Sequence, residues 1–146
     1  MKHVKKSVLL WFSPHQMFSL VADVERYPEF LPWCSGTEVL ERRGDELTAR
    51  VGLAFSGLKH AFTTRNTHVP DQSVTMKLVD GPFSHLDGLW QFKALASPQA
   101  CRVEFELSYA FSSRALELVI SPVFGRIADT FVDSFVKRAE SVYGAR

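Results

Sequence analysis

The segment CRVEFELSYAFSSRALELVISPVFGRIADTFVDSFVKRAESVYG, residues 101–144, changes its hydrophobic period once along its length. The first eleven residues alternate between apolar and polar side chains, which predicts a strand with one dry and one wet face. The apolar set is Cys101, Val103, Phe105, Leu107, Tyr109 and Phe111. Apolar residues then recur at three, four or seven positions, which predicts an amphipathic helix over 114–143. This second set is Leu116, Ile120, Phe124, Ile127, Phe131, Phe135 and Val142.

The predicted helix is long compared with the strands around it. Thirty residues of helix span roughly 45 Å, whereas a ten-residue strand spans about 33 Å. A continuous helix would therefore cross a whole sheet. Pro122 leaves open whether it is kinked, broken or started afresh at Ser121.

The residues before this stretch show the same period of two, which predicts further antiparallel strands. Three segments show this alternation. In the first, one face would carry Leu47, Ala49, Val51, Leu53 and Phe55 and the other Thr48, Arg50, Gly52, Ala54 and Ser56. In the second, the two faces would carry Phe62, Thr64 and Asn66 against Thr63, Arg65 and Thr67, and in the third Val74, Met76 and Leu78 against Thr75 and Lys77. The stretch LVDGPFSHLDGLWQF, residues 78–92, predicts two strands joined by a Gly-Pro turn.

The N-terminal third predicts one strand and two short helices. MKHVKKSVLLWF is predicted as the first strand, because its apolar run is shorter than the ~7–15 residues of a signal-peptide core. Ser13 and Pro14 begin a helix as its N-cap and first residue, and RYPEFLPWCSG is predicted as a short helix or structured loop. We therefore predict one α+β domain over 1–146, in which a curved antiparallel sheet of six or seven strands wraps around the C-terminal helix.

Composition is that of an ordinary soluble globule. Lys plus Arg is 17 and Asp plus Glu is 16, so no net charge directs the protein to nucleic acid. The two cysteines, Cys34 and Cys101, fit a reducing compartment as free thiols, and one disulfide between them stays open. No apolar run approaches the ~20 residues of a transmembrane segment. We expect a cytoplasmic protein, in contact at most with the periphery of the inner membrane.

Catalytic and metal-binding motifs are absent from the sequence. Its five histidines form no HxxxH or HxH pair, and there is no GxSxG, HExxH or Walker motif. A Ser-His-Asp triad assembled from distant segments stays open, because triads are geometric. We expect no catalytic residue, no metal site and no tightly bound cofactor.

Aromatic residues are the positive signal. Twelve Phe, three Trp and three Tyr lie largely on the predicted dry faces. They fit either a filled core, in which each buried ring contributes about 1.5–3 kcal/mol, or an apolar cavity between sheet and helix. The sequence pattern alone leaves both interpretations open.

Four motifs in this order before a long helix resemble the coenzyme Q-binding START-domain family: YPEFLPWCSG, FTTRN, LVDGPFSHLDGLWQF and CRVEFELSYAF. The resemblance covers essentially the whole chain. It implies a helix-grip fold with an apolar tunnel for a polyprenyl quinone such as ubiquinone. Gly88 beside Trp90 then fits a place where a missing side chain lets ligand or helix approach the sheet.

The resemblance implies which residues line the tunnel. We expect this lining from Phe62, Met76, Gly88, Trp90, Phe92, Phe105, Leu107, Tyr109, Phe124, Ile127 and Phe131. The tunnel mouth, with transient membrane contact, is expected at Tyr27, Phe30, Leu31 and Trp33. A hydrophobic plug on the end of the sheet is the alternative role for these four residues.

Two functions follow from the resemblance. The first is non-enzymatic binding of ubiquinone or another isoprenoid lipid in support of respiration. The alternative is a toxin-like translation inhibitor that binds the large ribosomal subunit and blocks subunit association. The quoted motifs are shared across both descriptions of the family, so the sequence does not separate the two.

Overall fold

A computed structural model describes residues 1–55 and 57–144 of the chain, with Phe55 described in its backbone alone. Ser56, predicted on the polar side of a strand, and residues 145–146, the end of the predicted domain, lie outside the described residues. The elements are β1 (Lys2–Leu10), α1 (Pro14–Ala22), the 3₁₀-helix η1 (Val24–Glu29), β2 (Cys34–Arg43), β3 (Glu46–Phe55), β4 (Leu58–Val69), β5 (Ser73–Asp80), β6 (Phe83–Ala94), β7 (Cys101–Phe111) and α2 (Arg114–Tyr143).

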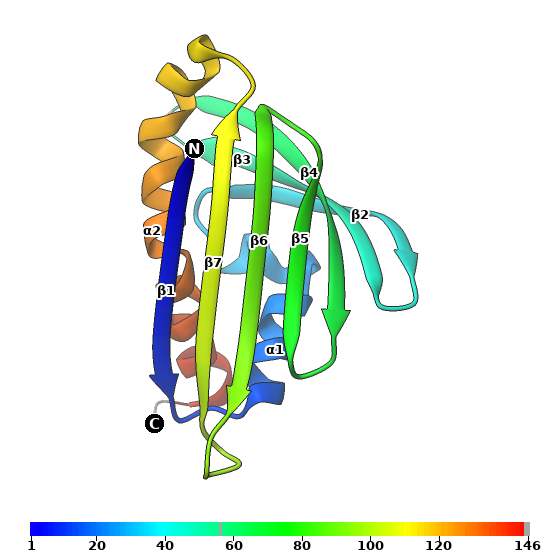
Figure 1. Cartoon of the computed structure of the whole chain (residues 1–146), viewed down its shortest axis with the longest axis vertical. Helices are drawn as coiled ribbons and strands as arrows, with labels where there is room; N and C mark the ends of the chain where they lie inside the picture. Colours follow the sequence, from blue (N-terminus) through cyan, green and yellow to red (C-terminus); the bar gives the residue numbers. More distant parts are fainter. Residues whose placement is uncertain (56, 145–146) are drawn as a thin grey trace.

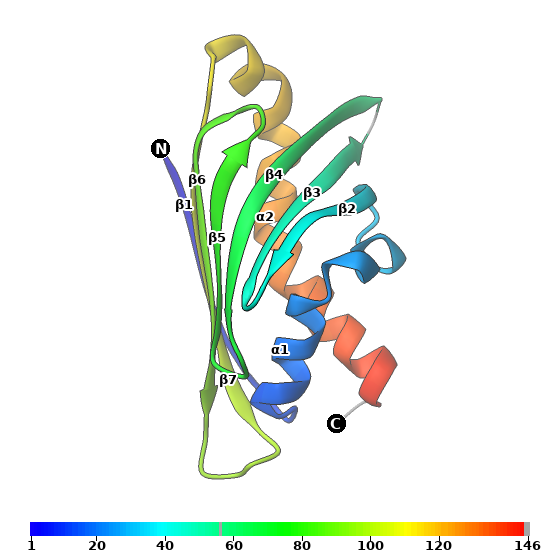
Figure 2. The ribbon, with the colours of Figure 1, turned by 90° about the vertical axis from the view of Figure 1, so that its right-hand side faces the viewer.

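The strands form one antiparallel sheet in the order β1-β7-β6-β5-β4-β3-β2 (Figure 1). Consecutive strands from β2 to β7 are neighbours, and β1 forms the edge opposite to β2 by pairing with β7. The sheet curves, so that α2 lies between the β5–β7 part and the slanting β2–β4 part, with α1 beside the end of α2 (Figure 2). The predicted fold class is therefore confirmed, including the two small helices after the first strand.

Local sequence explains how both helices begin. Ser13 and Gln16 form a capping box, in which the Ser13 hydroxyl accepts from the Gln16 backbone N–H at 3.1 Å and the Gln16 side chain accepts from the Ser13 N–H at 2.9 Å. Ser113 caps α2 by accepting from the backbone N–H of Leu116 at 3.1 Å. Each helix thus starts where a serine satisfies an otherwise unpaired N–H group.

Pro122 lies inside α2, and the helix continues through it. The helix therefore neither breaks at Pro122 nor starts afresh at Ser121. Proline removes one hydrogen bond to the carbonyl of Leu118, and Leu118 is 68% exposed, so water can bond that carbonyl instead.

Two groups of aromatic rings join α2 to the concave face of the sheet. The Trp90 cluster consists of Trp90, Phe92, Phe105, Phe131 and Phe135. Its ring centroids lie 4.7 Å apart for Trp90–Phe105 and 5.1 Å apart for Trp90–Phe135. These are ordinary distances for tilted and edge-to-face ring pairs, and Trp90 is fully buried. In this half of the molecule the core is filled.

The second group packs on the first half of α2. The Phe124 cluster consists of Phe62, Phe83, Tyr109, Phe111 and Phe124. Phe124 lies 4.7 Å from Tyr109 and 5.0 Å from Phe83, measured between ring centroids. The space between sheet and helix is thus closed by rings at two levels along α2.

Candidate functional site

A small apolar cavity lies between α2 and the sheet. Its walls include Phe105 and Phe131 from the Trp90 cluster and Phe62 and Phe124 from the Phe124 cluster, so it lies between the two clusters. Its volume is about 50 Å³. The complete lining is Trp33, Phe62, Thr64, Met76, Leu86, Phe105, Leu107, Phe124, Ile127, Ala128 and Phe131.

The structure brings most of the predicted tunnel residues together. Those that line the cavity are Phe62, Met76, Phe105, Leu107, Phe124, Ile127 and Phe131. Trp90, Phe92 and Tyr109 instead lie inside the aromatic clusters, because neighbouring rings cover them. Contact of any of these residues with a ligand stays a prediction.

Three lining residues were missing from the prediction. Thr64 follows Phe62 on the same face of β4, and Leu86 precedes Gly88 on the same face of β6. Ala128 is the next residue after Ile127 on α2. Strand alternation contains the signal for the first two, but it does not favour a threonine or a leucine over the aromatic residues on the same dry faces.

Gly88 makes room for a side chain of the neighbouring strand. Met76 is its cross-strand partner on β5, and the Met76 side chain lies where a side chain at Gly88 would begin. Leu107 Cδ1 lies 3.6 Å from the same position. The missing side chain therefore accommodates a methionine from the neighbouring strand, and contact of Gly88 with a ligand stays a prediction.

The cavity is much smaller than a ligand site for a lipid. Pockets for drug-sized molecules occupy roughly 300–1,000 Å³, whereas this cavity, at about 50 Å³, is large enough for only a few atoms. Met76 is its most adaptable wall, because methionine is unbranched and has three rotatable bonds. Room for a larger ligand would have to come from movement of Met76 and of the partly exposed rings of Phe62 and Phe131.

A polar pair lies at one wall of this apolar space. The Thr64 hydroxyl donates to Oδ1 of Asn66 at 2.8 Å, and both residues are buried on β4. The Trp90 indole N–H is also buried and has no hydrogen-bond partner among the described residues. Burial raises the pKa of the Tyr109 hydroxyl, with a further contribution from Asp129, so this phenol is neutral at ordinary pH. Ligand sites are typically apolar and contain a few polar groups, which fix the orientation of the ligand.

The predicted mouth is a packed segment. Tyr27, Leu31 and Trp33 are buried, and the Tyr27 hydroxyl donates to the backbone carbonyl of Val21 at 2.5 Å. Burial raises the pKa of Tyr27 above its usual range. Of the four residues only Trp33 reaches the cavity, where its ring lies 6.1 Å from that of Phe131. The segment has the geometry of the plug, and its gating role stays a prediction.

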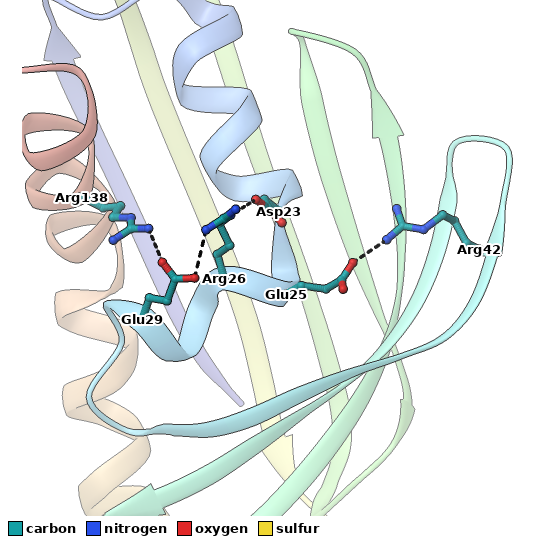
Figure 3. A network of polar contacts seen from close by, with 6 residues as sticks. All are labelled: Asp23, Glu25, Arg26, Glu29, Arg42 and Arg138. Carbon is teal, nitrogen blue, oxygen red and sulfur yellow. Dashed lines mark hydrogen bonds and ion pairs between the residues drawn. The ribbon is translucent and has the colours of Figure 1, made fainter.

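Ion pairs hold this segment in place (Figure 3). They connect η1 to α2 on one side and to β2 on the other. The pairs are Arg138–Glu29 at 2.8 Å, Arg26–Glu29 at 3.2 Å, Arg26–Asp23 at 3.2 Å and Arg42–Glu25 at 3.1 Å. The Arg138 guanidinium also lies 5.1 Å from the centre of the Phe30 ring. Exposed pairs contribute only about 0–1 kcal/mol each, so the buried rings hold the segment more strongly than the charges do.

The described residues contain no complete catalytic triad. Ser108 and Asp87 both contact Nε2 of His85, at 3.0 and 3.3 Å, whereas a triad needs the carboxylate and the nucleophile on different ring nitrogens. His15 Nδ1 meets Asp71 at 2.7 Å on the surface, and no hydroxyl or thiol of the described residues bonds its other nitrogen. Within residues 1–55 and 57–144, no three His, Cys, Asp or Glu side chains are placed to hold a metal ion.

A curved antiparallel sheet closed by a C-terminal helix, with an apolar cavity between them, defines a START-like helix-grip domain. The family described as polyketide cyclase / dehydrase and lipid transport matches residues 11–136, and the chain belongs to this family. No helix of the described residues is long and apolar enough to cross a membrane.

The chain is similar to proteins named for ribosome association and to a protein named for coenzyme Q binding. The Vibrio cholerae protein named ribosome association toxin RatA is 46% identical over 144 residues, which cover 99% of each chain. The Escherichia coli K12 protein of the same name is 42% identical and covers all of this chain and 92% of its own. A Xenopus laevis protein named coenzyme Q-binding protein COQ10 homolog B, mitochondrial, is 30% identical and covers 95% of this chain and 58% of its own.

Solved structures share the architecture. The 18 kDa protein CC1736 from Caulobacter crescentus is 33% identical, with a TM-score of 0.76 over 99% of this chain and all of its own. The Zhui aromatase/cyclase from Streptomyces sp. R1128 has a TM-score of 0.82 over 95% of this chain and 93% of its own, at 15% identity. The second likeness shows the fold alone.

The contact between Met76 and Gly88 can be tested by a double-mutant cycle. We expect Gly88→Leu to lower the free energy of unfolding by about 1–3 kcal/mol, because the added side chain collides with Met76. In a Met76→Ala background the new leucine takes the vacated space, so the two effects should couple favourably by about 1 kcal/mol or more. Urea unfolding of the four proteins measures this coupling.

Gly125→Ala is the matched control, because a Cβ there would meet no atom within 4 Å. It should raise stability by about 0.5–1 kcal/mol and show no coupling to Met76→Ala. Strictly additive effects of Gly88→Leu and Met76→Ala would contradict the proposed contact.

Proposed function

We propose that the protein binds a hydrophobic ligand, an isoprenoid lipid such as a polyprenyl quinone, between α2 and the sheet without transforming it. The apolar cavity between the two aromatic clusters carries this proposal. Its lining contains a single polar side chain, Thr64, which suits a long apolar ligand with a small polar end. The family description includes lipid transport, and one relative is named for coenzyme Q binding.

The ligand would enlarge the cavity rather than enter a preformed tunnel. Phe62, Met76 and Phe131 are partly exposed, so they lie where the cavity comes nearest to solvent. Their movement would open a path along α2 while the other rings of the Trp90 cluster, Trp90, Phe92, Phe105 and Phe135, stay packed. Thr64 and Asn66 would then meet the polar end of the ligand, because they are the buried polar pair beside this path.

A binding role suits the side chains better than catalysis does. His85 lacks the two-sided partners of a triad, and the cavity lining offers no histidine, cysteine or carboxylate as acid, base or nucleophile. The aromatase/cyclase among the solved structures shares the fold at 15% identity. A fold alone does not transfer a reaction.

Association with the large ribosomal subunit is the second candidate function. The observation that favours it is the identity of 42–46% over nearly the whole chain to proteins named ribosome association toxin. The two functions are compatible, because the ligand would occupy the interior while a ribosomal partner would contact the surface.

Ligand binding can be tested with Ala128→Leu, which adds bulk to the cavity wall. Purified protein extracted with organic solvent should yield an isoprenoid by mass spectrometry, and a short-chain ubiquinone should quench the tryptophan fluorescence saturably, because Trp33 lines the cavity. We expect Ala128→Leu to weaken this binding by about tenfold or more, equivalent to about 1.4 kcal/mol. Ala61→Leu, on the exposed face of β4, is the control and should bind like the wild type. Absence of both isoprenoid and saturable quenching in the wild type would refute the proposal.

Ribosome association predicts a change in sedimentation profiles. Overproduction should convert joined ribosomes into free subunits, and the protein should migrate with the large subunit. Ala128→Leu, compared with Ala61→Leu at equal expression, shows whether an occupied cavity is required for this effect. Unchanged profiles at high expression, with the protein remaining at the top of the gradient, would remove this candidate function.

A further inference from the structure

The first half of α2 exposes an apolar surface that the fold does not cover. Its members, here called the α2 patch, are Ala115, Leu118, Val119 and Pro122. Leu118 is 68% and Val119 is 57% exposed. Residues 115–125, ALELVISPVFG, contain only Glu117 and Ser121 as polar side chains, so this part of the helix is apolar nearly all round. Helices of that kind are normally buried on every side.

The opposite face of the same helical turns forms the core and the cavity wall. Ile120 and Phe124 are buried, and Phe124 and Ile127 line the cavity. One helical segment therefore separates the cavity from the α2 patch. Whatever covers the α2 patch comes to lie one helix diameter from the cavity, about 10 Å.

Two arginines bracket the α2 patch. Arg114 lies one turn before Leu118, and Arg126 lies one turn after Pro122, on the same exposed side of the helix. Neither guanidinium forms an ion pair or a hydrogen bond with another described residue, whereas the backbone carbonyl of Arg126 accepts from the Thr130 hydroxyl at 2.8 Å. Glu117 lies at the flank, in a groove that it shares with Met1 and Lys2. Asp129 is the first carboxylate on the exposed side beyond Arg126.

We propose that the α2 patch docks on the surface of an anionic lipid bilayer. Apolar side chains between cations match such a surface, because the apolar groups enter the acyl region while the arginines reach the headgroups. A second copy fits less well, since a twofold contact through this surface would bring the arginines of the two copies together. Nucleic acid phosphates would match the arginines and leave the apolar centre without a partner. This docking goes beyond the proposed function and does not depend on the identity of the ligand.

Vesicle flotation tests the inference with the whole protein. The wild type should bind vesicles of phosphatidylglycerol and phosphatidylethanolamine, and bind phosphatidylcholine vesicles weakly. Arg114→Gln with Arg126→Gln should weaken binding to the anionic vesicles by about 30-fold, because each basic residue near such a surface contributes a factor of about five. Leu118→Ser with Val119→Ser should weaken binding to a similar degree. Leu9→Ser is the control, because Leu9 is 62% exposed on β1 and should leave binding unchanged.

Several results would overturn the inference. These are no binding of the wild type to anionic vesicles, an equal loss with Leu9→Ser, or normal vesicle binding by both double variants. A wild-type dimer that the serine variant makes monomeric would assign the surface to a second copy instead. If the double variants bind vesicles normally but no longer comigrate with the ribosomal subunit, the α2 patch would be assigned to the ribosome. Isoprenoid extraction from the same samples tests ligand binding separately.

Discussion

Contacts between the aromatic rings of α2 and those of the sheet determine where the helix lies and which of its sides is buried. Phe131 and Phe135 pack on Trp90, and Phe124 packs on Phe83 and Tyr109. These contacts fix the helix at two levels, and the space between them becomes the cavity. The same contacts fix the outward side of α2, where Leu118 and Val119 stay exposed. Interior site and outer surface are therefore consequences of one packing arrangement.

The fold was predictable because each element carries its own period. The alternation over 101–111 and the helical spacing over 114–143 correspond to β7 and α2. The Gly-Pro turn falls between β5 and β6, and Ser13 begins α1. Whether the helix continues through Pro122 was not predictable, because this depends on whether water can reach the carbonyl that the proline leaves unpaired.

The candidate site was only partly predictable. Alternation shows which face of a strand is dry, but it does not show which dry side chain meets another ring and which meets empty space. Trp90 and Phe62 illustrate this, since both lie on dry faces and only Phe62 lines the cavity. The contact at Gly88 could not be predicted without the register of β5 against β6, which places Met76 opposite Gly88. Sequence spacing within one strand contains no information on that partner.

The proposed ligand would enter the space beside Met76, between the two aromatic clusters. The chain has three methionines, of which Met1 is exposed, Met17 is buried on α1 and Met76 lines the cavity. Selective labelling with [¹³C]methyl-methionine therefore gives one NMR signal at the site and two away from it. On titration with a short-chain ubiquinone, we expect a saturable shift of the Met76 methyl signal while the Met1 and Met17 signals stay in place. An unchanged Met76 signal at ligand concentrations that saturate binding would contradict the proposal.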